Sequence, residues 1–138
     1  MLEIQLRDVP EQPVVTEVRT VVQAEVEAWL REAMGRVAER SGRSDECAFI
    51  VIYEGNPNVG PAPVEVCATV ATGGDRTIPA HREAYARVTR AQVTSGQVGG
   101  VYEAIEAWIV ANGLTVARAP RETYRTGDES FDVAFPVT

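Results

Sequence analysis

The residues best suited to chemistry lie in one short segment near the C-terminal end, with the sequence RETYR. Side chains alternate across a strand, so Glu122 and Tyr124 share one face, which we expect to point toward the interior. The other face carries Arg121, Thr123 and Arg125, and we expect it to be solvated. An inward carboxylate is costly unless it is paired, protonated, hydrated or able to meet a ligand. Glu122 is therefore a candidate for binding a cationic or hydrogen-bonding ligand; a sheet-edge position or an arginine partner would also explain it.

Aromatic residues elsewhere in the chain are candidates for the walls of a cleft around Glu122. Tyr53 ends an earlier strand at a position equivalent to that of Tyr124, so the two tyrosines are expected to flank a groove. Tyr102, Trp29 and Trp108 lie on apolar helical stripes. Core packing and a place in the cleft wall both remain open for the two tryptophans.

Other reactive groups give weaker signals. His81 is the single histidine and follows Pro79, which favours a surface role over catalysis. Cys47 and Cys67 lie in apolar runs and are expected to be free buried thiols. The sequence has no serine in a nucleophile elbow and no metal-ligand spacing. We therefore expect no metal and no cofactor, and whether the protein is an enzyme stays open.

The length of 138 residues fits a single domain over 1–138. A net charge of −7 repels phosphate, so direct nucleic-acid binding is disfavoured. The N-terminus does not have the pattern of a signal peptide, and apolar runs are too short to span a membrane. We expect a soluble cytoplasmic protein that binds a small molecule. A second copy of the chain and a separate regulator are the protein partners left open.

Changes in apolar periodicity define the expected elements. Helical spacing runs from Val22 to a stop at Gly42, and again from Val98 to Asn112-Gly113. Residues 8–13 are expected to form a loop, and residues 78–85 have no clear assignment. Alternating or continuous apolar runs predict strands over 2–6, 14–20, 47–53, 64–70, 87–94, 121–126 and 131–137.

The chain also repeats itself. Both helices carry nearly the same four residues, EAWL at 27–30 and EAWI at 106–109. Each is followed by a glycine stop, a strand that ends near a tyrosine, and a further strand. Repeat one covers about 1–71 and repeat two about 84–138. This order predicts an α+β fold of two pseudo-symmetric strand-helix-strand-strand repeats, with an antiparallel sheet, both main helices on one side and a central ligand cleft.

The order of short motifs resembles that of the GyrI-like small-molecule-binding domain, which is also the effector-binding module of many AraC-type and MerR-type bacterial regulators. The resemblance covers nearly the whole chain. In the second half it rests on Ser95-Gly96, Tyr102, Trp108-Ile109, Asn112-Gly113, Glu122-x-Tyr124 and Phe131 to Val137; in the first, on Pro13 to Val15, Ile52-Tyr53 and Val64 to Val66.

The resemblance implies that Glu122 lies in the cleft and meets amphipathic, aromatic and often cationic ligands. We expect a stand-alone form of this domain, because the acidic balance does not suit DNA binding. Binding for sensing, sequestration or resistance is the favoured function. Some GyrI-like proteins are similar to hydrolases of cyclopropane-bearing compounds, in which Glu122 would activate water and Tyr124 would donate a hydrogen bond. A protein-interaction role, such as gyrase inhibition, is a further alternative.

Overall fold

The computed structural model describes residues 2–42, 48–89, 98–125 and 129–138. These residues form eight strands and two helices. The strands are β1 (Gln5–Val9), β2 (Gln12–Val21), β3 (Ala48–Tyr53), β4 (Ala62–Thr69), β5 (Arg76–Ile78), β6 (His81–Thr89), β7 (Arg121–Arg125) and β8 (Ser130–Val137), and the helices are α1 (Gln23–Ser41) and α3 (Val98–Ala111).

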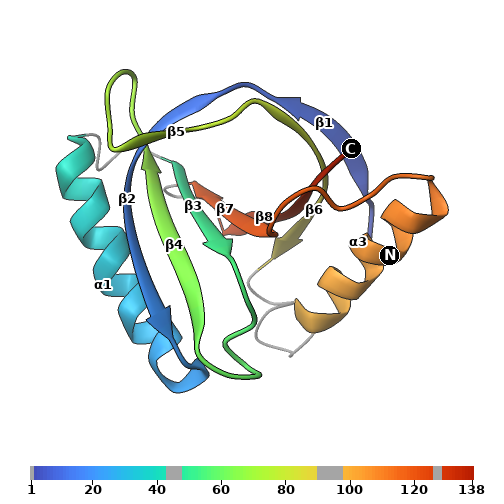
Figure 1. Ribbon diagram of the computed structural model, residues 1–138, viewed down its shortest axis with the longest axis horizontal. Helices are drawn as coiled ribbons and strands as arrows, with labels where there is room; N and C mark the ends of the chain where they lie inside the picture. Colours follow the sequence, from blue (N-terminus) through green and yellow to red (C-terminus); the bar gives the residue numbers. More distant parts are fainter. Residues whose placement is uncertain (1, 43–47, 90–97, 126–128) are drawn as a thin grey trace.

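All eight strands belong to one antiparallel sheet in the order β1-β6-β8-β7-β3-β4-β2-β5. Two short connections join strands from opposite ends of this order: residues 10–11 link β1 to β2, and residues 79–80 link β5 to β6. Because these connections are so short, the sheet must curl, and Figure 1 shows β1 and β5 forming an arc at one end of the molecule. The predicted α+β fold with an antiparallel sheet is confirmed.

The strands on the two sides of the central pair, β7 and β3, follow each other in corresponding order. One side continues through β8, β6 and β1, and the other through β4, β2 and β5. Each side contains a strand-helix-strand-strand unit, β6-α3-β7-β8 or β2-α1-β3-β4. This order supports the predicted duplication, which stays an interpretation.

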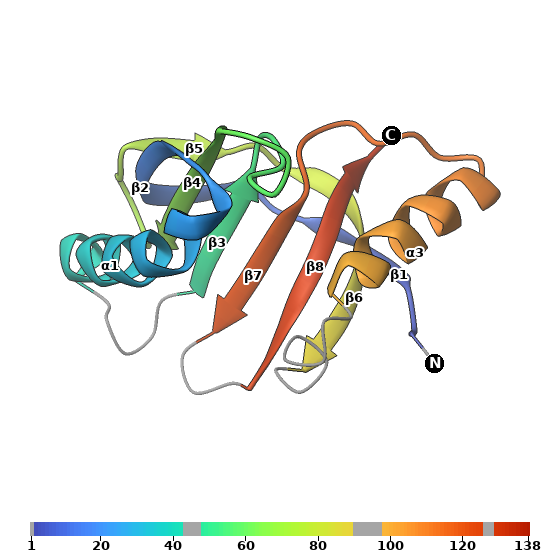
Figure 2. The same cartoon turned by 90° about the horizontal axis from the view of Figure 1, so that it is seen from below.

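The two helices cover the same face of the sheet but lie over separate halves, with β7 between them (Figure 2). α1 packs on β2 and β4, whereas α3 packs on β6 and β8. Each helix has its own apolar core, because its buried stripe meets the helix-facing residues of the strands below. The core under α1 includes Trp29, Ala33, Val37, Val51, Val64 and Val66; the core under α3 includes Val88, Val101, Ile105, Ile109, Phe131 and Val133.

Both helices begin and end close to the predicted residues. The backbone N–H of Val22 donates to the side chain of Glu25 (3.3 Å), which satisfies one of the free donors at the start of α1. α1 ends at Gly42, whose φ of 68° lies in the left-handed region that glycine adopts at little cost. α3 is followed by Gly113, whose φ of 72° gives the same kind of stop.

Strand boundaries in the N-terminal and middle segments differ from the prediction. β1 and β2 leave only residues 10–11 outside strands, where a loop over 8–13 was expected, because Asp8 and Val9 pair with β6. β6 begins at His81 rather than at residue 87 and is preceded by the unpredicted β5. Its alanines and charged residues lack strand propensity, so pairing with β1 and β8 decides its conformation. Residues 90–94, Cys47 and the 127–128 part of the last turn lie outside the described residues.

The face opposite the helices was expected to be solvated, and this expectation is wrong for Arg121. Arg121 is only 5% exposed, because this face lines the inside of the curled sheet. Asp132, the neighbour of Thr123 on β8, is 0% exposed and contacts Arg7 (3.0 Å), Arg87 (3.1 Å) and Arg125 (3.4 Å). Three arginines from other strands thus pair with one acid on β8, which sequence alternation within one strand does not reveal.

The packing of α1 gives a direct test of the first core. Trp29 is 4% exposed among aliphatic residues, so Trp29→Ala should leave a cavity and lower the free energy of unfolding by about 3–5 kcal/mol. Urea unfolding followed by far-ultraviolet circular dichroism measures this change. Val110→Ala, on the exposed side of α3, is the matched control and should change stability by less than about 0.5 kcal/mol. Equal effects of the two substitutions would contradict the core placement.

Candidate functional site

Glu122 lies on the helix-facing side of β7, near the middle of the sheet. Its cross-strand neighbours are Val51 on β3 and Val133 on β8, which belong to the two separate cores. The residue is only 7% exposed. Tyr124, two residues further along β7, packs against both cores. Glu122 and Tyr124 therefore mark the seam where the two halves of the protein meet.

Tyrosine hydroxyls surround the Glu122 carboxylate. The Tyr102 hydroxyl, from α3, donates to Glu122 Oε2, and the Tyr124 hydroxyl, from β7, donates to Oε1. The hydroxyl of Tyr53, at the end of β3, also interacts with this carboxylate. The residues come from three elements that are distant in sequence, and the fold brings four of the six predicted site residues together.

The electrostatics of this group keep the tyrosines protonated. Burial raises the pKa of Tyr53 and of Tyr102 above the ordinary value, and the negative charge of Glu122 raises both further. A hydrogen bond donated to the carboxylate also favours the neutral phenol, since only the protonated hydroxyl can donate. The hydroxyls consequently remain donors that stabilise the carboxylate.

Glu122 differs from the other buried acids in its partners. Asp132 contacts three arginines, Glu65 accepts two hydrogen bonds from Arg76, and Glu83 contacts Arg7 and His81. No ion pair joins Glu122 to a cationic side chain in the described part of the chain. Its hydrogen bonds come from neutral hydroxyls, so its negative charge has no counter-ion there.

Two phenylalanines complete the aromatic surroundings and were not predicted. Phe131 stacks on Tyr124 with ring centroids 4.8 Å apart, and Phe135 meets Tyr102 edge-on at 5.9 Å. Both belong to β8, which pairs with β7. The signal was present in the alternation of residues 131, 133 and 135, but it becomes a site only when the neighbour of β7 is known.

The two tryptophans pack against different cores, Trp29 under α1 and Trp108 under α3. Trp29, on α1, is buried against the sheet, and its side chain interacts with that of Glu17 on β2. The register places Glu17 on the same row as Glu122 but three strands away, about 14 Å at ordinary strand spacing. Trp108 is half-buried and packs against the core under α3, which Tyr102 and Tyr124 also contact. Core packing accounts for the position of both residues.

Two cavities lie on the opposite face. They measure about 440 and 230 Å³, share Arg121 and His81 in their linings, and do not include Glu122. A central cleft beside Glu122 stays a prediction. Within the described ranges, no group of three His, Cys, Asp or Glu residues is arranged to hold a metal ion. No described helix is long and apolar enough to cross a membrane.

Comparison with known proteins identifies structural neighbours only. No protein-family model matches the sequence, and no curated protein matches it significantly. The chain is similar to the EcmrR C-terminal domain, with a TM-score of 0.76 and 18% identity over 100% of this chain and 98% of that domain. A Staphylococcus aureus MU50 protein, assigned by name to bacterial transcription regulation, has a TM-score of 0.63 and 17% identity over 100% of this chain and 99% of that one.

EcmrR has also been solved in a DNA complex, EcmrR-RPo. That chain is similar with a TM-score of 0.73 and 18% identity over 99% of this chain. The present chain spans 57% of it. Identities this low establish the fold alone, and the fold expected from the GyrI-like resemblance is confirmed.

The tyrosine cluster predicts an unusual alkaline titration. Tyr53 and Tyr102 should stay protonated as the pH rises past about 10, the ordinary tyrosine pKa. In Glu122→Gln both tyrosines should ionise at lower pH than in the parent, because the phenolate that forms is no longer repelled by the Glu122 carboxylate. Carbon NMR of the tyrosine rings measures each midpoint.

Glu106→Gln removes a charge from the exposed side of α3 and is the control for this titration. It should leave the midpoints of Tyr53 and Tyr102 unchanged. If Glu122→Gln also leaves them unchanged while the protein is folded, the carboxylate does not act on these hydroxyls as described.

Proposed function

We propose that the protein binds small cationic aromatic or amphipathic molecules beside Glu122, with Tyr53, Tyr102 and Tyr124 as the surrounding groups. The observation that carries this proposal is a carboxylate only 7% exposed whose described partners are neutral hydroxyls. A desolvated charge without a counter-ion attracts a cation more strongly than one in water. The other buried acids already have arginine partners and offer no such preference.

The carboxylate keeps capacity for a ligand while it holds the tyrosines. An ionised carboxylate has about four acceptor positions, and the hydroxyls of Tyr102 and Tyr124 each occupy one. A ligand cation can therefore contact Glu122 without displacing every hydroxyl. The faces of the tyrosine rings carry negative electrostatic potential, and they stabilise a desolvated cation by about 0.5–2 kcal/mol at each favourable ring.

The location of the site suits a domain that senses its ligand through a change in its own packing. Tyr102 belongs to α3, while Tyr53 and Glu122 lie on the central strands β3 and β7. A ligand that displaces the Tyr102 hydroxyl from Glu122 breaks a contact between α3 and the sheet. One structural neighbour is the C-terminal domain of EcmrR, a protein also solved in a complex with DNA, and another is named as a transcription regulation protein. These neighbours support a role in sensing. A separate regulator is then the fitting protein partner.

Hydrolysis of a reactive small molecule is the second candidate function. The observation that favours it is the direct contact of one carboxylate with several hydroxyls, an arrangement in which Glu122 could accept a proton from water while Tyr124 or Tyr102 donates to developing negative charge. Turnover separates the two candidates. A binding protein returns its ligand unchanged, whereas a hydrolase converts it, and Glu122→Gln abolishes that conversion.

Selective binding of a cation tests the proposed function. Phenyltrimethylammonium and its neutral isostere tert-butylbenzene have nearly the same shape and differ in charge. Isothermal titration calorimetry should show that the parent prefers the cation, and that Glu122→Gln weakens cation binding by about tenfold or more while binding of the neutral compound changes little.

Glu106→Gln, which removes the same charge from the exposed side of α3, should bind both compounds as the parent does. Circular dichroism verifies that each variant is folded. Equal cation affinity in the parent and in folded Glu122→Gln would overturn the proposal, as would a parent that binds the neutral compound as tightly as the cation.

A further inference from the structure

Arg121 occupies the inner face of the curled sheet with few of its donors used. The residue is 5% exposed, and its Nη2 donates to the carbonyl of Ala119 at 3.1 Å. Within the described part of the chain, its Nε is a buried polar atom that lacks a hydrogen-bond partner. Leaving a buried charged donor unpaired costs free energy, because the group has lost its hydrogen bonds to water. Such a donor is rare in a folded protein and calls for an acceptor.

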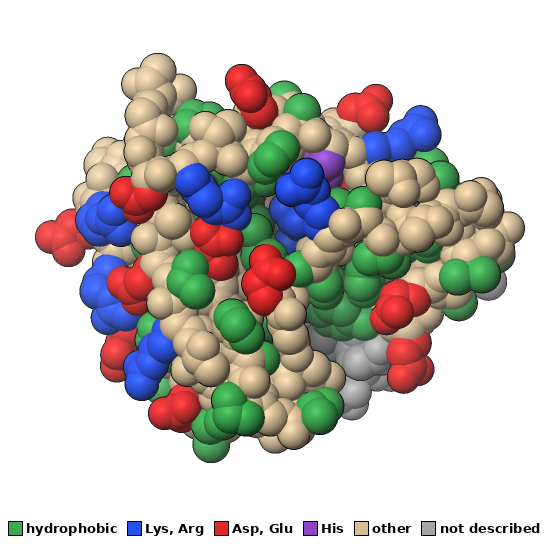
Figure 3. All heavy atoms as spheres, viewed as in Figure 1, with side chains coloured by type: hydrophobic (Ala, Val, Ile, Leu, Met, Phe, Trp, Pro, Cys, Tyr) green, Lys and Arg blue, Asp and Glu red, His purple; other side chains and the backbone are tan. Residues whose placement is uncertain are grey.

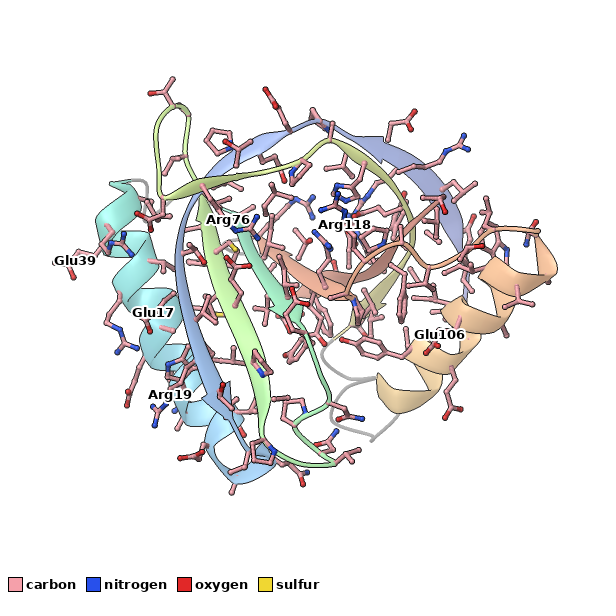
Figure 4. All side chains as sticks on the ribbon, viewed as in Figure 1. Glu17, Arg19, Glu39, Arg76, Glu106 and Arg118 are labelled. Atoms are coloured by element: carbon pink, nitrogen blue, oxygen red, sulfur yellow. The ribbon has the colours of Figure 1, made fainter. Side chains whose placement is uncertain are left out.

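The Arg121 side chain lines a cavity of about 440 Å³. This volume falls within the range of small-molecule sites, about 300–1,000 Å³. Two further arginines border it, Arg76 from β5 and Arg118 from the segment before β7, and both lie inside the arc of the curled sheet in Figure 4. Figure 3 shows basic and acidic side chains gathered beside the single histidine on the same side of the molecule.

Hydrogen bonds along β8 hold the segment that carries Arg118. Thr115 and Thr138 exchange two backbone hydrogen bonds, and the N–H of Ala117 donates to the carbonyl of Pro136 at 2.8 Å. Arg118 follows directly and forms no ion pair with a described residue. Its guanidinium is therefore available at the edge of the cavity that Arg121 lines.

The charges around this cavity leave a local positive excess. Glu65 is committed to Arg76 through hydrogen bonds of 2.6 and 2.8 Å. Glu83 lies near Arg121, but its two oxygens contact Arg7 and His81. Burial lowers the pKa of Arg121, and the charge of Glu83 offsets this effect only in part. Glu54 is the remaining acid of the lining, against Arg118 and Arg121.

We propose that this cavity binds the carboxylate of a small organic acid, with Arg121 and Arg118 as its cationic partners. A guanidinium donates two parallel hydrogen bonds to a carboxylate, which matches a buried arginine with unused donors. The apolar part of the ligand would contact Ile52, Ile78 and Ala119, which also line the cavity. The site thus combines a charged end and an apolar end.

The presence of glutamates favours a singly charged ligand. Glu54 and Glu65 line the same cavity, so a phosphate dianion would meet repulsion that a monocarboxylate largely avoids. Inorganic phosphate also has no apolar group that could contact Ile52 and Ile78. An aromatic or branched aliphatic monocarboxylate satisfies both conditions.

This site is independent of the one at Glu122. Arg121 and Glu122 are adjacent on β7, so their side chains point to opposite faces of the sheet. Among the described residues, the helix-facing side presents an acid that forms no ion pair, and the inner side presents an arginine that forms none. The two sites are expected to select ligands of opposite charge.

Binding of benzoate tests the proposal without knowledge of the natural ligand. Titration of the parent with sodium benzoate at constant ionic strength, followed by NMR of the arginine Nε–H groups, should shift the Arg121 signal saturably as its Nε–H gains an acceptor. Arg118→Gln should weaken benzoate binding about tenfold, the loss of one charge-assisted contact. Arg31→Gln removes an exposed arginine from α1 and should have no effect.

Further outcomes decide against the proposal. Absence of a saturable shift at Arg121 overturns it, as does an equal loss of affinity in Arg118→Gln and Arg31→Gln, which would indicate nonspecific attraction. Phosphate binding as tight as benzoate binding would overturn the assignment to organic carboxylates. Glu122→Gln should leave benzoate affinity unchanged; a loss there would show that benzoate occupies the helix-facing side instead.

Discussion

The structure depends on how it accommodates one buried negative charge at its centre. Glu122 lies between Val51 and Val133, where the cores of the two halves meet, and it holds its place through hydroxyls of tyrosines. Each hydroxyl comes from an element that must be positioned for this contact. The seam of the protein is therefore polar at one point and apolar on either side, and this contrast is the basis of the proposed ligand site.

The buried acids on the two faces of the sheet have different kinds of partner. On the inner face, buried acids such as Asp132 are surrounded by arginines, and hydrogen bonds from Arg87 and Arg7 hold the pKa of Asp132 below its ordinary value despite its burial. On the helix-facing side, the described hydrogen-bond partners of Glu122 are hydroxyls. The short connections β1–β2 and β5–β6 create this contrast, because they curl the sheet and enclose the arginine-rich face.

Much of this organisation could be predicted from the sequence, because helical stripes and the alternation in β7 and β8 are local patterns. They predicted the positions of α1 and α3 and the face of the sheet on which Glu122 lies. β5 and the start of β6 could not be predicted, since their conformation depends on pairing with distant strands. The burial of Arg121 and the roles of Phe131 and Phe135 were missed for the same reason: each depends on which strand lies beside β7, and periodicity within one strand does not contain that information.

A crystal structure of the protein with phenyltrimethylammonium tests the central claim most directly. The account predicts that the ammonium group lies within about 4 Å of the Glu122 carboxylate, the usual limit for an ion pair, with its methyl groups against the rings of Tyr53, Tyr102 and Tyr124. A cation bound elsewhere, with the hydroxyls of Tyr102 and Tyr124 still on Glu122, would contradict it. In that case the buried carboxylate would serve only to join the two halves of the protein.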